Sequence, residues 1–265
     1  MVQIDLHQIE ETAAFLQRKG INSAPRLVIL GTGFHNFIAH LEQVQKISYS
    51  EIPHFPSATM DEPGFLIKAK LNAQSILAMK GRYHHYEGYQ ASEIIHPLRV
   101  LKLLGLKELI ISNSAMSLRP ELAEGSLGLI KDHINLIPDN PLRGYNFENL
   151  GPRFPDLEDL YSPRLRRFTQ NLIKDKGLNV LPELVYLAHA GPSCPSPAER
   201  NFYRIAGADV YGMSTSMEAI AAAHMQIEVL AISVIRHHKQ SALQAEGDQK
   251  LSTLLADYLK NAPSL

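Results

Sequence analysis

Five short polar segments in this chain could carry chemistry, because each directly follows an apolar run of strand length. They are Gly31-Thr-Gly33, Gly81 to Gly88, Ser112 to Ala115, Gly212 to Thr215 and Ser233 to His238. In an α/β sheet, ligands bind at the carboxyl ends of the strands. The functional site is therefore expected among these segments.

The segment from Gly81 to Gly88 has the densest group of polar side chains. Between its two glycines stand Arg82, His84, His85, Tyr86 and Glu87. An arginine offers a planar fork that suits phosphate, and a nearby histidine can donate a hydrogen bond or move a proton near neutral pH. A solvated loop with one buried histidine is the alternative. A metal site is disfavoured, because adjacent histidines on a strand point to opposite faces and no cysteine accompanies them.

Two other segments place small or hydroxyl side chains before an expected helix. Gly31-Thr-Gly33 can expose backbone N–H groups and the Thr32 hydroxyl to an anion, and Ser214 with Thr215 can do the same. The first is not a dinucleotide fingerprint, since Asn36 stands where a third glycine is needed, and it is not a Walker A loop. A tight turn and a helix N-cap remain the plain alternatives.

The loop from Ala190 to Glu199 contains three prolines and the only cysteine, Cys194. A reactive thiol is disfavoured here, because Pro195 has no backbone N–H for an oxyanion hole and no helix begins at once to lower the pKa of the thiol. We expect Cys194 to be buried or to line a wall.

Composition excludes several classes of partner. The 26 Lys and Arg residues nearly balance the 27 Asp and Glu residues, so neither nucleic acid nor an anionic membrane is expected as a partner. One cysteine cannot form an internal disulfide, no signal peptide is recognisable, and the apolar run from Val229 to Ile235 is too short to cross a bilayer. These features predict a cytoplasmic protein.

Apolar periodicity predicts an α/β fold, with one domain over residues 1–265. Its core is expected to be a mixed, mostly parallel twisted sheet flanked by helices. Expected strands begin at 26, form a pair within 65–79, cover 108–113, and lie near 126–136, 184–190, 208–213 and 227–235. Expected helices lie near 5–19, 34–41, 91–104, 163–176, 196–206, 215–225 and 244–261. The long irregular stretch from Asp139 to Tyr161 is of a length that is often functional.

Taken together, these motifs resemble the trimeric purine nucleoside phosphorylase family, over a region from Leu27 to about Ile235. The motifs that carry the resemblance are Gly81 to Tyr89, Asp132 to Leu136 with Asn140 to Gly144, Gly151 to Pro155, Ala190 to Ser193 with Ala198-Glu199, and Gly207 to Thr215. Five such motifs in the family's order are hard to attribute to chance.

The resemblance implies phosphorolysis of purine (deoxy)ribonucleosides to the free base and the sugar 1-phosphate. Inorganic phosphate is the co-substrate, and neither a metal nor an organic cofactor is expected. The resemblance implies phosphate contacts from Thr32, Arg82, His84, the backbone N–H of Ser114, and Ser214. It implies ribose contacts from Tyr86, Met213 and, across the interface of a homotrimer, Phe154 of a neighbouring subunit.

The chain departs from the family pattern around the base. Cys194-Pro195 replaces Phe-Glu, so the carboxylate that accepts from a 6-oxopurine is missing, and Arg236-His237 replaces Thr-Asn. An imidazole N–H can still donate to the purine N7, so His237 joins His84 as a candidate catalytic residue. The predicted base contacts are Ala115, Cys194, Pro195 and His237.

Two more departures concern the neighbouring loops. Asn113 to Ser117 lacks the two glycines of the family's Asn-Ala-Ala-Gly-Gly, and Asp61 to Gly64 has no counterpart of the histidine in the phosphate-covering loop. We therefore predict a purine nucleoside phosphorylase with an altered base preference. The alternatives are an enzyme for another nucleoside, and a weakly active or non-catalytic relative that binds a nucleoside or a phosphorylated ligand.

Overall fold

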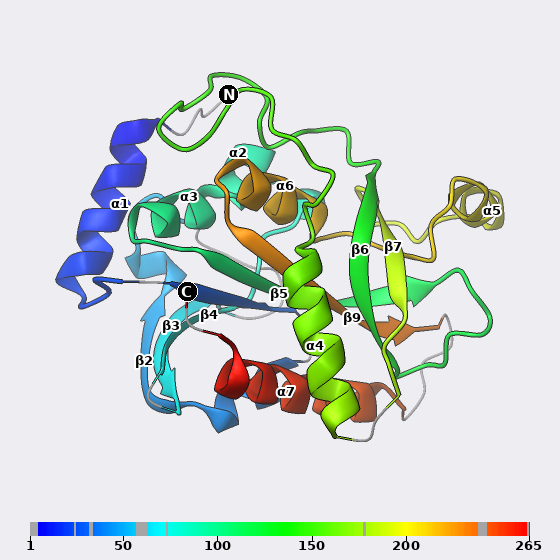
Figure 1. The fold of residues 1–265 in the computed structure, drawn as a ribbon. Coiled ribbons are helices and arrows are strands. Elements are labelled where there is room, and N and C mark those ends of the chain that lie inside the picture. The colour runs from blue at the N-terminus through cyan, green and yellow to red at the C-terminus, as the bar shows by residue number, and fades with distance from the viewer. Residues whose placement is uncertain are drawn as a thin grey trace.

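The computed structural model describes residues 5–23, 25–31, 34–56, 63–72, 74–176, 179–237, 243–263 and 265, with the backbone alone at 34, 35, 243 and 244. Within these residues, nine strands form one sheet in the order β2-β3-β4-β1-β5-β8-β7-β6-β9 (Figure 1). The strands are β1 Arg26–Leu30, β2 Glu42–Ser48, β3 Phe65–Leu71, β4 Gln74–Lys80, β5 Glu108–Ser117, β6 Leu127–Asn135, β7 Glu183–Ala188, β8 Val210–Gly212 and β9 Glu228–Arg236. The α-helices are α1 Leu6–Arg18, α2 Ala91–Ile94, α3 His96–Leu103, α4 Pro163–Asp175, α5 Pro197–Ile205, α6 Ser216–His224 and α7 Leu243–Asn261. Short 3-10 helices are η1 Phe34–His40, η2 Tyr49–Glu51 and η3 His85–Glu87.

The sheet is mixed and closes on itself at one side. β1 runs parallel to β4 and β5, and β5 runs parallel to β9. β9 also pairs antiparallel with β6, so β5, β8, β7, β6 and β9 form a ring of strands. The predicted α/β class, with a mixed sheet flanked by helices, is confirmed.

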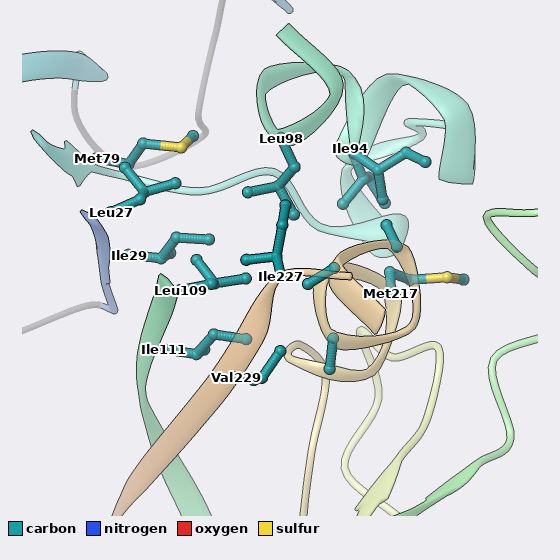
Figure 2. Close-up of a cluster of buried hydrophobic side chains, with 14 of the residues drawn as sticks. Leu27, Ile29, Met79, Ile94, Leu98, Leu109, Ile111, Met217, Ile227 and Val229 are labelled. Carbon is teal, nitrogen blue, oxygen red and sulfur yellow. The ribbon is translucent and has the colours of Figure 1, made fainter. Parts of the chain in front are cut away.

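Helices cover both faces of the sheet because side chains alternate along the buried strands. Leu27 and Ile29 of β1 face the layer of α1, α3 and α6 and belong to the same buried cluster as Leu98 and Met217 (Figure 2). Val28, the residue between them, faces the opposite layer, which is formed largely by α4 and α7. Both sides of the central strands are therefore dry, which explains their continuous apolar runs.

The sequence did not predict β2, and it misplaced some boundaries. β2 is a mostly exposed edge strand that pairs only with β3, so it carries little apolar alternation to read. β5 continues to Ser117 because β8 and β9 pair with its second half. The expected helix 91–104 divides at Ile95 into α2 and α3, with Pro97 in the first turn of α3. Among the helices in the described ranges, none combines the length and apolar content needed to cross a membrane.

A buried histidine makes the stability of this fold depend on pH. His96 is fully buried at the start of α3, and its Nε2 lies 3.3 Å from Thr12 Oγ1 on α1. Burial lowers the pKa of His96 from 6.5 to about 3, with smaller contributions from His54 and Arg99. The folded protein therefore keeps this imidazole neutral where the unfolded chain binds a proton.

We expect the free energy of unfolding to fall as the pH drops from 6.5 towards 3, because the unfolded state binds the extra proton. The loss should be about 2 kcal/mol by pH 5. Urea denaturation of His96→Gln and wild type across this range measures the effect, and the variant should show a flatter slope. His7→Gln, at an exposed position of α1, is the control. Equal slopes for His96→Gln and wild type would contradict the assignment.

Candidate active site

A cavity of about 230 Å³ lies at the carboxyl ends of β1, β4 and β8, beside the second half of β5. Its described lining residues are Gly31, Arg82, His84, Tyr86, Asn113, Ser114, Met116, Tyr211, Gly212, Met213 and Ser214. The structure thus brings together six of the predicted contact residues: Arg82, His84, Tyr86, Ser114, Met213 and Ser214. They come from three of the five polar segments, and Gly31 adds a lining residue from a fourth, as expected for the carboxyl ends of strands.

Arg82 supplies a buried positive charge to the cavity. Its side chain is 5% exposed, and Nε and one terminal nitrogen donate to Glu218 Oε1 at 3.0 and 2.6 Å. The other terminal nitrogen lies 3.3 Å from the carbonyl oxygen of Ser112. Glu218 sits in the first turn of α6 and is equally buried, so the pair links the end of β4 to the start of α6. This geometry holds the guanidinium in one orientation for an incoming anion.

His84 is held in place by its own segment. Its Nδ1 lies 2.6 Å from Glu87 Oε1, and its ring stacks on Tyr86 at a centroid distance of 4.8 Å. The carboxylate accepts from Nδ1, which leaves Nε2 as the nitrogen that can interact with a ligand. Gly88 ends the turn at φ +95°, a backbone conformation that favours glycine.

A chain of hydrogen bonds fixes the start of α6 beside Ser214. Ser233 of β9 donates to Asn113 Oδ1 at 2.6 Å, and Asn113 Nδ2 donates to Thr215 Oγ1 at 2.8 Å. Thr215 has φ +74°, an unfavourable conformation for a β-branched residue, and this buried contact stabilises it. The hydroxyl of Tyr186 accepts from the Ser214 backbone N–H at 3.2 Å, and burial raises the pKa of Tyr186 so that the hydroxyl stays neutral.

Part of the cavity lining is apolar and consists of Met116, Tyr211 and Met213. Tyr211 is buried, packs against the rings of Tyr203 and His189, and has its pKa raised to about 12 by burial. Thioether and aromatic walls suit a flat heterocycle. The cavity lining therefore combines polar groups that can bind an anion with apolar side chains that can contact a flat ring.

The loop from Ala190 to Glu199 lies close to Met213 of the apolar lining at Gly191. A Cβ at Gly191 would lie 2.4 Å from Met213 Sδ, so a larger residue there would require the Met213 side chain to shift. Its φ of +68° favours glycine as well. Of the two alternatives expected for Cys194, burial is wrong, because its side chain is exposed, whereas Pro195 is buried.

Several predicted contacts lie outside the described lining of the cavity. His237 Nε2 lies 2.8 Å from the carbonyl oxygen of Leu122, Ala115 is fully buried, and Phe154 is 87% exposed. Cys194 and Pro195 belong to the loop described above. Thr32 falls outside the described residues, as do Asp61 and Glu62 of the expected phosphate-covering loop.

Sequence analysis did not assign contacts to Asn113, Met116 and Tyr211 of the cavity lining, nor a role to Glu218. Tyr211 directly precedes the Gly212-to-Thr215 segment, so an aromatic residue at the end of a predicted strand was an available signal. Glu218 was visible as an acidic residue in an apolar helix, but its partner Arg82 lies 136 positions away. Within the described part of the chain, no three His, Cys, Asp or Glu side chains are grouped so as to hold a metal ion.

Comparison with known proteins identifies the family to which this chain belongs. A profile of the Phosphorylase superfamily matches residues 25–262. Purine nucleoside phosphorylase 1 of Geobacillus stearothermophilus is 42% identical over 228 residues, covering 86% of this chain and 83% of that protein. The chain belongs to the purine nucleoside phosphorylase family.

Solved structures of purine nucleoside phosphorylases share the fold over the full length. The schistosoma enzyme in complex with hypoxanthine has a TM-score of 0.92 and 30% identity, covering 100% of both chains. Isoform 2 from Schistosoma mansoni, in complex with cytosine and ribose-1-phosphate, has a TM-score of 0.90 and 32% identity, covering 99% of both chains. The predicted family is confirmed, and the cavity belongs to a purine nucleoside phosphorylase fold.

We expect Arg82→Lys to raise the KM for phosphate by about tenfold or more, since lysine keeps the charge but lacks the fixed fork. The KM for the nucleoside should change much less. Initial rates at varied phosphate and fixed nucleoside concentration measure the effect. Arg166→Lys, which alters an ion pair with Glu183, is the control. A phosphate KM within twofold of wild type would remove Arg82 from the anion site.

Proposed function

We propose that this protein is a purine nucleoside phosphorylase with an altered base preference. A phosphate oxygen attacks the anomeric carbon of a purine (deoxy)ribonucleoside while the glycosidic C–N bond breaks. The products are the free base and the sugar 1-phosphate. The observation that carries the proposal is one cavity whose lining combines a buried guanidinium with apolar side chains.

The described residues divide into roles that suit this reaction. Arg82, His84, the Ser114 backbone N–H and Ser214 bind phosphate, and Thr32 is proposed as a further contact from sequence alone. The sugar gains positive charge in the transition state, so a phosphate held beside it lowers the barrier. Tyr86 and Met213 also line the cavity and are proposed to contact the sugar. The expectation of no metal and no organic cofactor remains a prediction.

The apolar lining supports a relaxed base preference. Its described walls are Met116, Tyr211 and Met213, with no carboxylate among them. A carboxylate favours the N1–H of 6-oxopurines and disfavours the N1 lone pair of adenine, so its loss weakens that discrimination. His237 remains a proposed donor to N7, although in this structure its Nε2 is close to a backbone carbonyl oxygen.

We expect base release from inosine, guanosine and adenosine that requires phosphate, with kcat/KM values within about a hundredfold of one another. Xanthosine and cytidine extend the panel, because isoform 2 from Schistosoma mansoni binds cytosine with ribose-1-phosphate. Chromatography of the free base and of the sugar 1-phosphate measures the reaction. Release without phosphate would indicate a hydrolase. No release from any nucleoside would favour the non-catalytic alternative.

We propose a homotrimer in which Phe154 completes the site of a neighbouring subunit. Phe154 is 87% exposed in the isolated chain, with the Arg153 guanidinium 5.8 Å from the centre of its ring. An aromatic side chain this exposed gains most by packing against a second copy. The cytoplasmic location also remains a proposal from the sequence.

Light scattering should give a mass three times the 29.6 kDa of one chain. Phe154→Ala should lower kcat/KM for the nucleoside by about tenfold and leave the phosphate KM nearly unchanged. Phe202→Ala, an exposed aromatic residue on α5, is the matched control. A monomeric wild type with full activity would exclude the shared site.

A further inference from the structure

Arg236 ends β9 beside the cavity and is 8% exposed. It pairs with Met116 in the parallel register of β5 and β9. Paired residues on neighbouring strands, and alternate residues along one strand, share a face of the sheet. Arg236, Met116 and Ser114 therefore face the same side. Met116 and Ser114 line the cavity, and Arg236 contacts the side chain of Ser114 without belonging to the described lining.

The guanidinium of Arg236 connects Ser114 to the last helix. Its Nε donates to Ser114 Oγ at 3.3 Å, and a terminal nitrogen pairs with Asp248 of α7. A guanidinium can only donate, so the serine oxygen must be the acceptor in this contact. The hydroxyl proton of Ser114 then points away from Arg236. Since Ser114 is exposed to the cavity, that proton is available to a ligand there.

We infer that Arg236 is a positioning residue that presents the Ser114 hydroxyl as a hydrogen-bond donor to bound phosphate. This inference rests on the proposed function, which places phosphate against the polar residues of the cavity lining. It adds a side-chain donor to the backbone N–H of Ser114. Arg236 stands where the family pattern has threonine, so the contact is a feature of this chain.

Asp248 keeps Arg236 in the position that this role needs. A guanidinium as buried as this one is costly without a counter-charge, and the side chain of Asp248 is 16% exposed beside it. The start of α7 packs closely on the same strand end, because a Cβ at Gly247 would lie 2.6 Å from Val234 Cγ1. The planar fork can contact Ser114 and Asp248 at the same time, which a single ammonium group cannot do in the same geometry.

The first test is Arg236→Lys, which keeps a positive charge for Asp248 and loses the Nε donor. We expect the Kd of phosphate, measured by calorimetry, and its KM to rise about tenfold. kcat and the nucleoside KM should stay within twofold. A phosphate Kd within twofold of wild type would overturn the inference.

Ser114→Ala should raise the phosphate Kd by the same factor. The double variant should bind phosphate no more weakly than either single variant, because both changes remove the same contact. Independent, additive losses would overturn the inference. If Arg236→Lys does not fold, Ser114→Thr and Ser114→Ala carry the test: threonine keeps the donor and should retain affinity, whereas alanine should lose it. Equal affinities for these two variants would also overturn it.

Arg26→Lys is the matched control for general destabilisation. Arg26 is 6% exposed, and its Nε donates to Glu108 Oε1 at 3.1 Å. These are the first residues of β1 and β5, so they lie at the ends of the strands opposite to the cavity. It should lower Tm without changing the Kd of phosphate. An equal change in Kd would overturn the inference.

The binding readout separates this inference from the proposed function. Phosphate binding that depends on Arg236, without turnover of any nucleoside, would refute the activity and support the inference. Nucleoside turnover that is unaffected in Arg236→Lys would support the proposed activity and refute the inference. A wild-type protein that binds no phosphate overturns the inference outright.

Discussion

The buried ion pair between Arg82 and Glu218 is the constraint on which the rest of the site depends. Both side chains are 5% exposed, so separating them would leave an uncompensated charge in the interior, at a cost of about 3–5 kcal/mol. The pair can form only if the end of β4 meets the first turn of α6. That meeting places Ser214 beside a fixed cation, which is what an anionic co-substrate requires.

The ring of strands β5, β8, β7, β6 and β9 also positions the other polar groups of the cavity. β9 lies next to β5 over nine residue pairs, which brings Ser233 to Asn113 and Arg236 to Ser114. The first contact continues to Thr215 at the start of α6, and the second continues to α7 through Asp248. The polar lining of the cavity is thus held by buried hydrogen bonds that reach the sheet and two helices, and such networks resist reorientation when a ligand binds.

The polar and the apolar residues of the cavity lining differ in how well they could be predicted from the sequence. Arg82, His84, Tyr86 and Ser214 lie in short motifs next to strand ends, and local pattern sufficed to select them. Met116 and Tyr211 of the apolar lining were not selected, although Tyr211 lies within the Gly207-to-Thr215 motif, because apolar residues in a strand resemble core residues. His237 illustrates the limit, because its place in the chain suggested the base, whereas its side chain is directed to the carbonyl oxygen of Leu122.

The sequence by itself determined the α/β class, the family and most of the segments that line the cavity. The spacing of apolar residues and the motifs at strand ends are local properties of the chain, so they can be recognised without the fold. The tertiary structure decided which partners those residues have. Glu218 lies 136 positions from Arg82, and Arg236 lies 122 positions from Ser114. Contacts of that range depend on strand order and register, and no local pattern encodes them. Several residues of the cavity lining could therefore be predicted from the sequence, while the orientation of each group had to come from the fold.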